Sequence, residues 1–217
     1  MVETVVIKGV TIRIDGLREH EGETMAHTFT ETRRVHGVVE QRVFEESVNI
    51  RSSYFDIMVR TLELLPESHL SDVVAMNIIK IRPNLRVGGG SGQDGYIYIS
   101  PFSLDNRYNR VHNQTLLHEI GHKVDHHYHA VDNMTALRQN FLRHVHHDGG
   151  TQSASEAYGD CYMDYFHRGA SAFSGGFSHQ AHGVTFDHHG ETITYNSQQI
   201  NEERLAAFLS VAPMHAA

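Results

Sequence analysis

Residues 116–125 read Leu-Leu-His-Glu-Ile-Gly-His-Lys-Val-Asp, and the expected fold follows from this segment. Its apolar residues recur at helical spacing, which predicts an amphipathic helix with one buried side: Leu116, Leu117, Ile120 and Val124. On such a helix His118 and His122 lie one turn apart and can direct two imidazole nitrogens at one metal ion. Glu119 lies beside them and can reach a water on that metal without being a ligand.

Histidine is so abundant in this chain that the pattern needs support from its surroundings. The 217 residues include 19 histidines, so a chance match on a surface or core-packing helix is the alternative explanation. Asp125 follows His122 by three residues and His118 by seven, which places it on the same helical face. There we expect it to accept the second ring N–H of a ligand histidine and to fix its tautomer. The stretch therefore predicts a zinc site.

The residues just after His122 do not supply the third protein ligand that a catalytic zinc site needs. The metzincin pattern places a glycine and then a third histidine there. Asp125 and Tyr128 stand at those two positions instead, so the metzincin arrangement is excluded.

A later helix, expected over residues 155–166, carries two carboxylates that are suited to the site. Glu156 and Asp160 lie one turn apart and share one face of this helix. We expect Glu156 to be the third ligand and Asp160 to orient a ligand histidine from behind. Asp160 and Asp148 stay open as alternative third ligands.

The two segments together resemble the gluzincins, zinc peptidases whose third ligand is a glutamate. Residues 118–125 match the His-Glu-x-Gly-His-x-x-Asp helix of the anthrax lethal factor type of catalytic domain, and residues 156–166 match its second helix more loosely. The resemblance covers residues 90–168. It implies an α+β, zincin-like fold, in which a small mixed sheet with an edge strand packs on an active-site helix and a second ligand-bearing helix.

The chain departs from the gluzincin pattern at one point, and a second family of zinc peptidases matches it in part. No tyrosine stands one or two turns before Glu156, where some relatives place an oxyanion-stabilising phenol. The aspzincins, whose second element is Gly-Thr-x-Asp-x-x-Tyr-Gly, match less well because Ser153 stands at the aspartate position.

The resemblance implies hydrolysis of a peptide bond by a zinc-bound water, with a peptide or protein as substrate. Glu119 would take the proton of that water and pass it to the leaving amine. The chemistry also calls for one donor to the oxyanion, and the candidates left open are Tyr158, Tyr162, His182, His167 and His179. A zinc amidase that acts on cell-wall peptides and a non-catalytic, histidine-rich metal-binding protein stay open as alternatives. A bacterial effector or toxin is one setting for such a peptidase.

The composition is that of a globular protein without disulfides. One domain over residues 1–217 is expected, with residues 1–50 considered as an N-terminal appendage. The formal net charge of −8 argues against nucleic acid and membrane surfaces as partners, and Cys161 is the only cysteine. Neither a signal peptide nor a long apolar run is visible, so we expect a cytoplasmic protein, or one exported without a cleaved signal. The oligomeric state is left open.

Periodicity predicts the remaining elements. Alternation over residues 96–100 predicts a strand, and we expect Tyr96, Ile97 and Tyr98 to form the edge strand that binds substrate by main-chain hydrogen bonds. The glycines of residues 88–92 predict a flexible loop. Residues 4–14 are expected to be β-strand with Gly9 as a bulge or turn. The other expected elements are a strand at 75–81, a loop or short hairpin at 17–36, helices at 53–65, 130–143 and 199–211, and a hairpin at 184–194.

Overall fold

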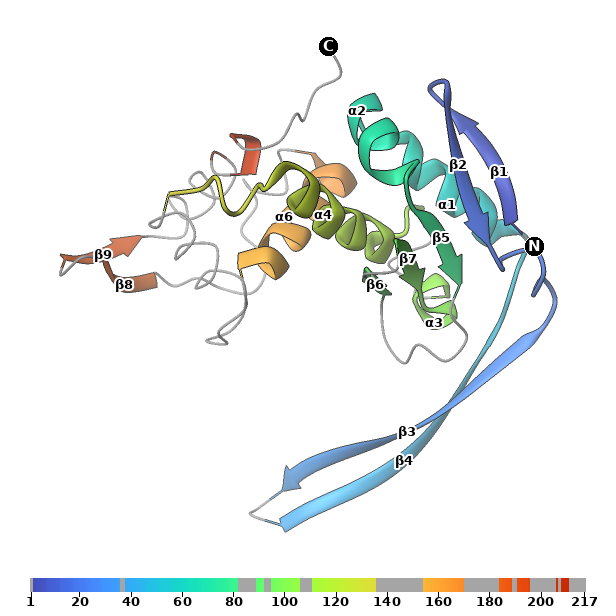
Figure 1. Cartoon of the computed structure of the whole chain (residues 1–217). Helices are drawn as coiled ribbons and strands as arrows, with labels where there is room; N and C mark the ends of the chain where they lie inside the picture. Colours follow the sequence, from blue (N-terminus) through green and yellow to red (C-terminus); the bar gives the residue numbers. More distant parts are fainter. Residues whose placement is uncertain are drawn as a thin grey trace.

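The computed structural model describes residues 2–35, 38–81, 89–91, 95–105, 111–135, 154–169, 184–188, 191–195, 206 and 208–210. It has the expected mixture of helices and strands, an α+β fold in which a small mixed sheet meets two long helices (Figure 1). None of the helices within these ranges is long and apolar enough to cross a membrane.

The central sheet is mixed, and only its middle is parallel. Its strands are β1 (Val2–Ile7), β2 (Val10–Asp15), β5 (Ile78–Ile81), β6 (Gly89–Ser91) and β7 (Tyr96–Ile99). Their order is β1-β2-β5-β7-β6, in which β5 runs parallel to both neighbours, and β1 and β6 lie antiparallel at the two edges. Alternate residues of β5 and β7 are buried, which gives the sheet a core-facing side.

Two predictions for this sheet are decided by the structure, and the second is wrong. Gly9 forms the turn considered for it within residues 4–14, because the chain reverses at Lys8 and Gly9, whose φ angles of 48° and 79° are left-handed. β1 and β2 therefore pair as a hairpin. The glycine run that predicted a loop contributes β6, since main-chain pairing with β7 requires no side chains.

The helices pack on this sheet and on one another. The predicted helix that begins at residue 53 is confirmed, and the predicted helix at 155–166 is confirmed with slightly wider bounds. The elements are α1 (Ser53–Glu63), α2 (Glu67–His69), the π-helical turn η1 (Leu70–Val74), α3 (Pro101–Leu104), α4 (Gln114–Tyr128) and α6 (Ala154–Arg168). α4 contacts β6, β7 and η1 on one side, and α6 packs along it on the other.

The sequence of α4 explains its position and its ends. All four apolar residues at helical spacing are fully buried, as predicted: Leu116, Leu117, Ile120 and Val124. The helix begins where the Asn113 side chain accepts a hydrogen bond of 2.7 Å from the backbone N–H of Leu116. It ends at His129, whose φ of 51° is left-handed. Residues 130–135 form a turn, so the predicted helix at 130–143 is wrong there, and its remainder lies outside the described residues.

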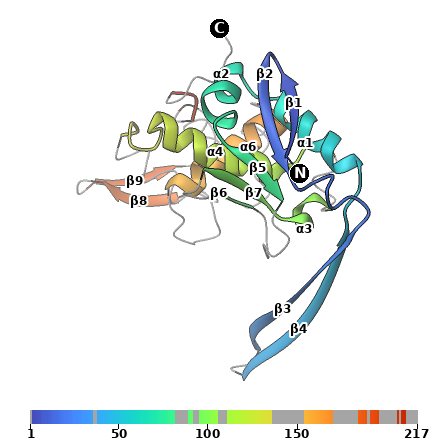
Figure 2. The same cartoon turned by 45° about the vertical axis from the view of Figure 1, so that its right-hand side comes forward.

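Two hairpins complete the described chain. β3 (Thr24–Val35) and β4 (Val38–Asn49) pair along their full length and project from the body (Figures 1 and 2). This hairpin is longer than the loop or short hairpin that was predicted at residues 17–36. β8 (Val184–His188) and β9 (Glu191–Tyr195) confirm the predicted hairpin. Of the predicted helix at 199–211, only residues 206 and 208–210 are described, and Phe208 is buried in the core.

Candidate metal centre

α4 and α6 approach closely because each has a glycine where the two helices meet. A Cβ at Gly121 would lie 2.9 Å from the Cα of Gly159 and 2.9 Å from the Cβ of Tyr162. A Cβ at Gly159 would lie 3.1 Å from the ring of His118. Interiors are close-packed, so such distances leave no room for a side chain. The two glycines therefore allow the ligand-bearing faces of the helices to meet.

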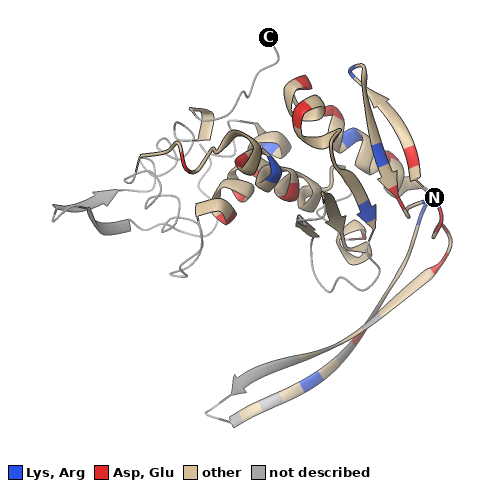
Figure 3. Cartoon of the chain, viewed as in Figure 1, with Lys and Arg blue, Asp and Glu red and all other residues tan. Residues whose placement is uncertain are grey.

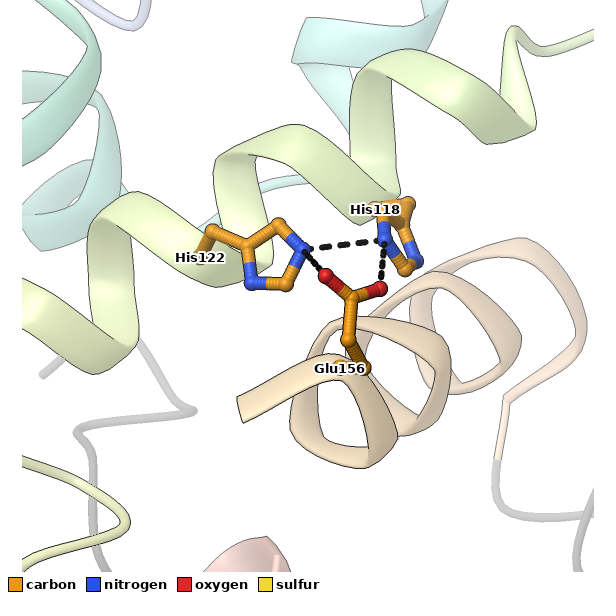
Figure 4. A group of neighbouring side chains, drawn as sticks. All are labelled: His118, His122 and Glu156. Carbon is orange, nitrogen blue, oxygen red and sulfur yellow. Dashed lines mark hydrogen bonds and ion pairs between the residues drawn. The ribbon is translucent and has the colours of Figure 1, made fainter. Parts of the chain in front are cut away.

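Three side chains from the two helices converge on one point (Figure 4). The Nε2 atoms of His118 and His122 are 3.0 Å apart, and each lies 3.4 Å from an oxygen of the Glu156 carboxylate. Ligands bound to tetrahedral zinc at ~2.0–2.2 Å lie about 3.3 Å from one another, so these separations fit a shared ion. Within the described part of the chain, no other group of three or more histidine, cysteine or acidic side chains is close enough to hold a metal.

Asp160 supports His118 from the side away from this point. Its carboxylate accepts a hydrogen bond of 2.8 Å from the Nδ1 of His118, which leaves the lone pair of Nε2 directed at the ligand point. Burial acts to lower the pKa of His118, but the hydrogen bond and the charge of Asp160, with smaller effects of Glu119 and Glu156, raise it overall. Asp160 thus takes the orienting position expected for it.

His122 is held through a serine rather than directly by Asp125. The Nδ1 of His122 lies 3.3 Å from the Oγ of Ser155, and that hydroxyl donates a hydrogen bond of 2.7 Å to Asp125. The second carboxylate oxygen of Asp125 accepts from the backbone N–H of Val131 at 2.8 Å. The predicted direct contact of Asp125 with a histidine is therefore wrong, because a hydroxyl from α6 lies between them. The role of Ser155 depends on the packing of the two helices, and no pattern in the sequence indicates it.

Glu119 lies beside the ligand point, against the sheet. A Cβ at Gly89 would lie 2.6 Å from its Cγ and 3.0 Å from its Oε1, so β6 runs directly over this side chain. Only 6% of Glu119 is exposed, and burial raises its pKa to about 7. The charge of His118 opposes this rise, whereas Glu156 and Asp160 add to it, since acidic residues lie on both helices (Figure 3). The small exposed part of Glu119 faces a cleft of about 1220 Å³.

The strand at the edge of the sheet beside this cleft is β6. β7 pairs with β5 on one side and with β6 on the other, so both of its main-chain edges take part in ladders. The prediction that Tyr96, Ile97 and Tyr98 form the substrate edge strand is therefore wrong. Gly89 and Gly90 of β6 line the cleft instead.

The predicted oxyanion donors do not meet at the cleft. Tyr158 and Tyr162 are fully buried in the core, and the hydroxyl of Tyr162 lies 2.7 Å from the Nδ1 of His69. On α6 both tyrosines lie about 200–240° round the helix from Glu156, which turns them away from the ligand point. Burial raises the pKa of both phenols. His182 lies outside the described residues.

Comparison with known proteins adds no relative. No protein-family model matches the chain, and no curated protein and no solved structure matches it either. The resemblance to gluzincins therefore rests on the two motifs. The fold is mixed α+β, and its His118, His122 and Glu156 group could bind a metal ion.

Proposed function

We propose that this chain is a zinc-dependent peptidase with a zincin-like catalytic site. The observation that carries the proposal is the convergence of His118, His122 and Glu156 on one point, with Glu119 next to it. Two imidazole nitrogens and one carboxylate are a donor set of catalytic zinc sites, which keep a further position open. Calcium and magnesium prefer oxygen ligands alone, so the donor chemistry favours zinc.

The proposed chemistry depends on a proton carried by Glu119. When bound, zinc would supply a Lewis acid that activates water and polarises the scissile carbonyl. The carboxylate of Glu119 would accept a proton from the attacking water and release it to the leaving nitrogen. The side chain of Glu119 occupies the space that a Cβ at Gly89 would fill, so β6 would limit its movement away from the ligand point.

The proposed substrate lies along β6. This strand forms the edge of the described sheet, and its glycines line the cleft beside Glu119. An extended peptide can add to such an edge through main-chain hydrogen bonds, which would bring one peptide bond to the ligand point. Without side chains at Gly89 and Gly90, β6 leaves the cleft open to a range of peptide side chains.

The proposal is tested by measuring zinc content and peptide cleavage in the same variants. Zinc per chain is determined by mass spectrometry of the metal, and cleavage by liquid chromatography of a mixed peptide library. We expect about one zinc per wild-type chain. Glu119→Gln should keep zinc and lose turnover by roughly 10²–10⁴-fold, as expected for loss of a general base. Glu156→Gln should lose both, and Glu63→Gln, on an exposed part of α1, is the matched control that should lose neither.

The other outcomes are informative as well. Wild-type turnover in Glu119→Gln would contradict the role of Glu119 as general base, whereas a wild-type chain that binds zinc but cleaves no peptide would be a non-catalytic metal-binding protein. Loss of zinc in Asp160→Asn but not in Glu156→Gln would reverse the assignment of ligand and orienting residue. Cleavage of cell-wall peptides alone, with proteins and other peptides untouched, would identify an amidase.

A further inference from the structure

The long hairpin of β3 and β4 is suited to binding a further β-strand. Its base is anchored where Met25 pairs with Val48, because both side chains are buried. Beyond that pair the hairpin projects from the body, away from α4 and α6 (Figures 1 and 2). A two-stranded ribbon is at best marginally stable in water, and three or more strands are needed for independent stability. The hairpin therefore gains most from additional strands.

The exposed side chains of β4 suggest what kind of strand would fit. Val39 and Val43 are 59% and 66% exposed, although apolar side chains on an exposed edge strand favour pairing with another chain. Val39, Gln41 and Val43 alternate along the strand and therefore share one face. A partner strand should offer apolar residues opposite these two valines.

A second copy of β4 meets this requirement. Residues 39–43 read Val-Glu-Gln-Arg-Val, in which valines and opposite charges stand symmetrically about Gln41. In an antiparallel pair of two identical strands centred on Gln41, each Val39 is opposite Val43 of the second copy. Each Glu40 is likewise opposite Arg42 of the second copy. Apolar pairs and opposite-charge pairs across strands are both stabilising.

The neighbouring twofold registers are less favourable. Centring the pair on residue 40 sets two glutamates opposite each other, and centring it on residue 42 sets two arginines opposite each other. Like charges directly opposite in a sheet are destabilising. Complementarity thus selects the register centred on Gln41.

We propose that β4 pairs with β4 of a second copy of this chain, in antiparallel orientation and centred on Gln41. The interface is isologous, with the same segment used by both copies, and it closes as a dimer. It converts two ribbons into one four-stranded sheet with the order β3-β4-β4-β3. The interface uses no residue of the metal centre, so the proposed dimer does not depend on the proposed function.

A disulfide cross-link tests the register. Opposite residues of an antiparallel pair have Cα atoms about 4.5–5.5 Å apart, which is within the reach of a disulfide. Gln41→Cys should therefore form a covalent dimer under mild oxidation. Glu45→Cys, also exposed on β4, is the matched control, because the two copies of position 45 would lie about 27 Å apart. The natural Cys161 is buried and should not contribute.

Two double variants test the dimer contact in solution, and their oligomeric state is measured by sedimentation. Because a contact this short buries little area and should be weak, chain concentrations up to roughly 200 µM are used. V39E/V43E sets glutamate opposite glutamate and should be monomeric. V39E/V43K differs at one residue, sets glutamate opposite lysine, and should dimerise as the wild type does. A monomeric wild-type chain, equal dimerisation of the two variants, or equal cross-linking at positions 41 and 45 would overturn the proposal. If a double variant fails to fold, the single cysteine substitutions decide.

Discussion

Glu119 should make the zinc-stripped protein less stable at alkaline pH, and Glu119→Gln should remove this effect. Burial raises the pKa of this carboxyl to about 7 from 4.5. Below pH 4.5 it is protonated in both the folded and the unfolded chain, so it adds no penalty. As the pH rises from 4.5 to 7, the unfolded chain loses the proton while the folded chain retains it, and stability falls. Above pH 7 the full penalty is present.

The magnitude follows from the difference between the two pKa values. A difference of roughly 2.5 pKa units corresponds to about 3 kcal/mol. At pH 5 the penalty is below about 1 kcal/mol, because the unfolded chain is only partly ionised there. For a chain of this length, 3 kcal/mol shifts the thermal midpoint by roughly 6–12 °C. Glu119→Gln should therefore melt higher than the wild type by about that amount at pH 8 and by much less at pH 5.

The assay is thermal unfolding followed by circular dichroism, in the presence of a chelator, at both pH values. Glu63→Gln controls for the loss of a carboxylate at an exposed position. Added zinc should shrink the difference between wild type and Glu119→Gln, because a nearby cation favours the ionised carboxyl. Equal midpoints for the two proteins at pH 8, or the same gain at pH 5 and pH 8, would refute the reasoning.

Three further predictions concern the residues that bring the site together. Gly121→Ala should lower the free energy of unfolding by about 1–3 kcal/mol, measured in urea, because its Cβ would lie 2.9 Å from the Cα of Gly159. Asp160→Asn should weaken zinc binding by roughly 10–100-fold in competition with a chelating dye, and Ser155→Ala should have a smaller effect of about tenfold. The order reflects the histidine contacts of the two residues, 2.8 Å for Asp160 and 3.3 Å for Ser155. Gly89→Ala should reduce turnover without loss of zinc, because its Cβ would lie 2.6 Å from the Cγ of the proposed general base.

The parts of the fold that sequence analysis predicted correctly are those determined locally. The apolar spacing in residues 116–124 is sufficient to define α4, and the same helix sets His118 one turn from His122. Glu156 and Asp160 could be named for the same reason, since they share one face of a regular helix. Helical geometry alone also predicts that Tyr158 points away from Glu156, because two positions along a helix turn a side chain by about 200°.

The errors arose where a distant segment decides the structure. Residues 89–91 form a strand because β7 is available beside them, and a glycine run carries no periodicity that would show it. Gly9 could be named as a turn residue, but the left-handed φ of Lys8 beside it is one that its residue type does not favour. Ser155 separates Asp125 from His122 only because the start of α6 packs against α4 beside these two residues. Long-range packing of this kind leaves little trace in a single sequence.

The residues of the candidate site share an energetic property that connects them with metal binding. Glu119 is a carboxyl whose burial disfavours its ionised form. The Nε2 atoms of His118 and His122 face each other at 3.0 Å, so without a proton or a cation between them two lone pairs oppose each other. Each of these features destabilises the fold in the absence of a ligand. A divalent cation at the ligand point would stabilise the carboxylates and both lone pairs at once, so metal binding and folding of α4 against α6 should be thermodynamically coupled.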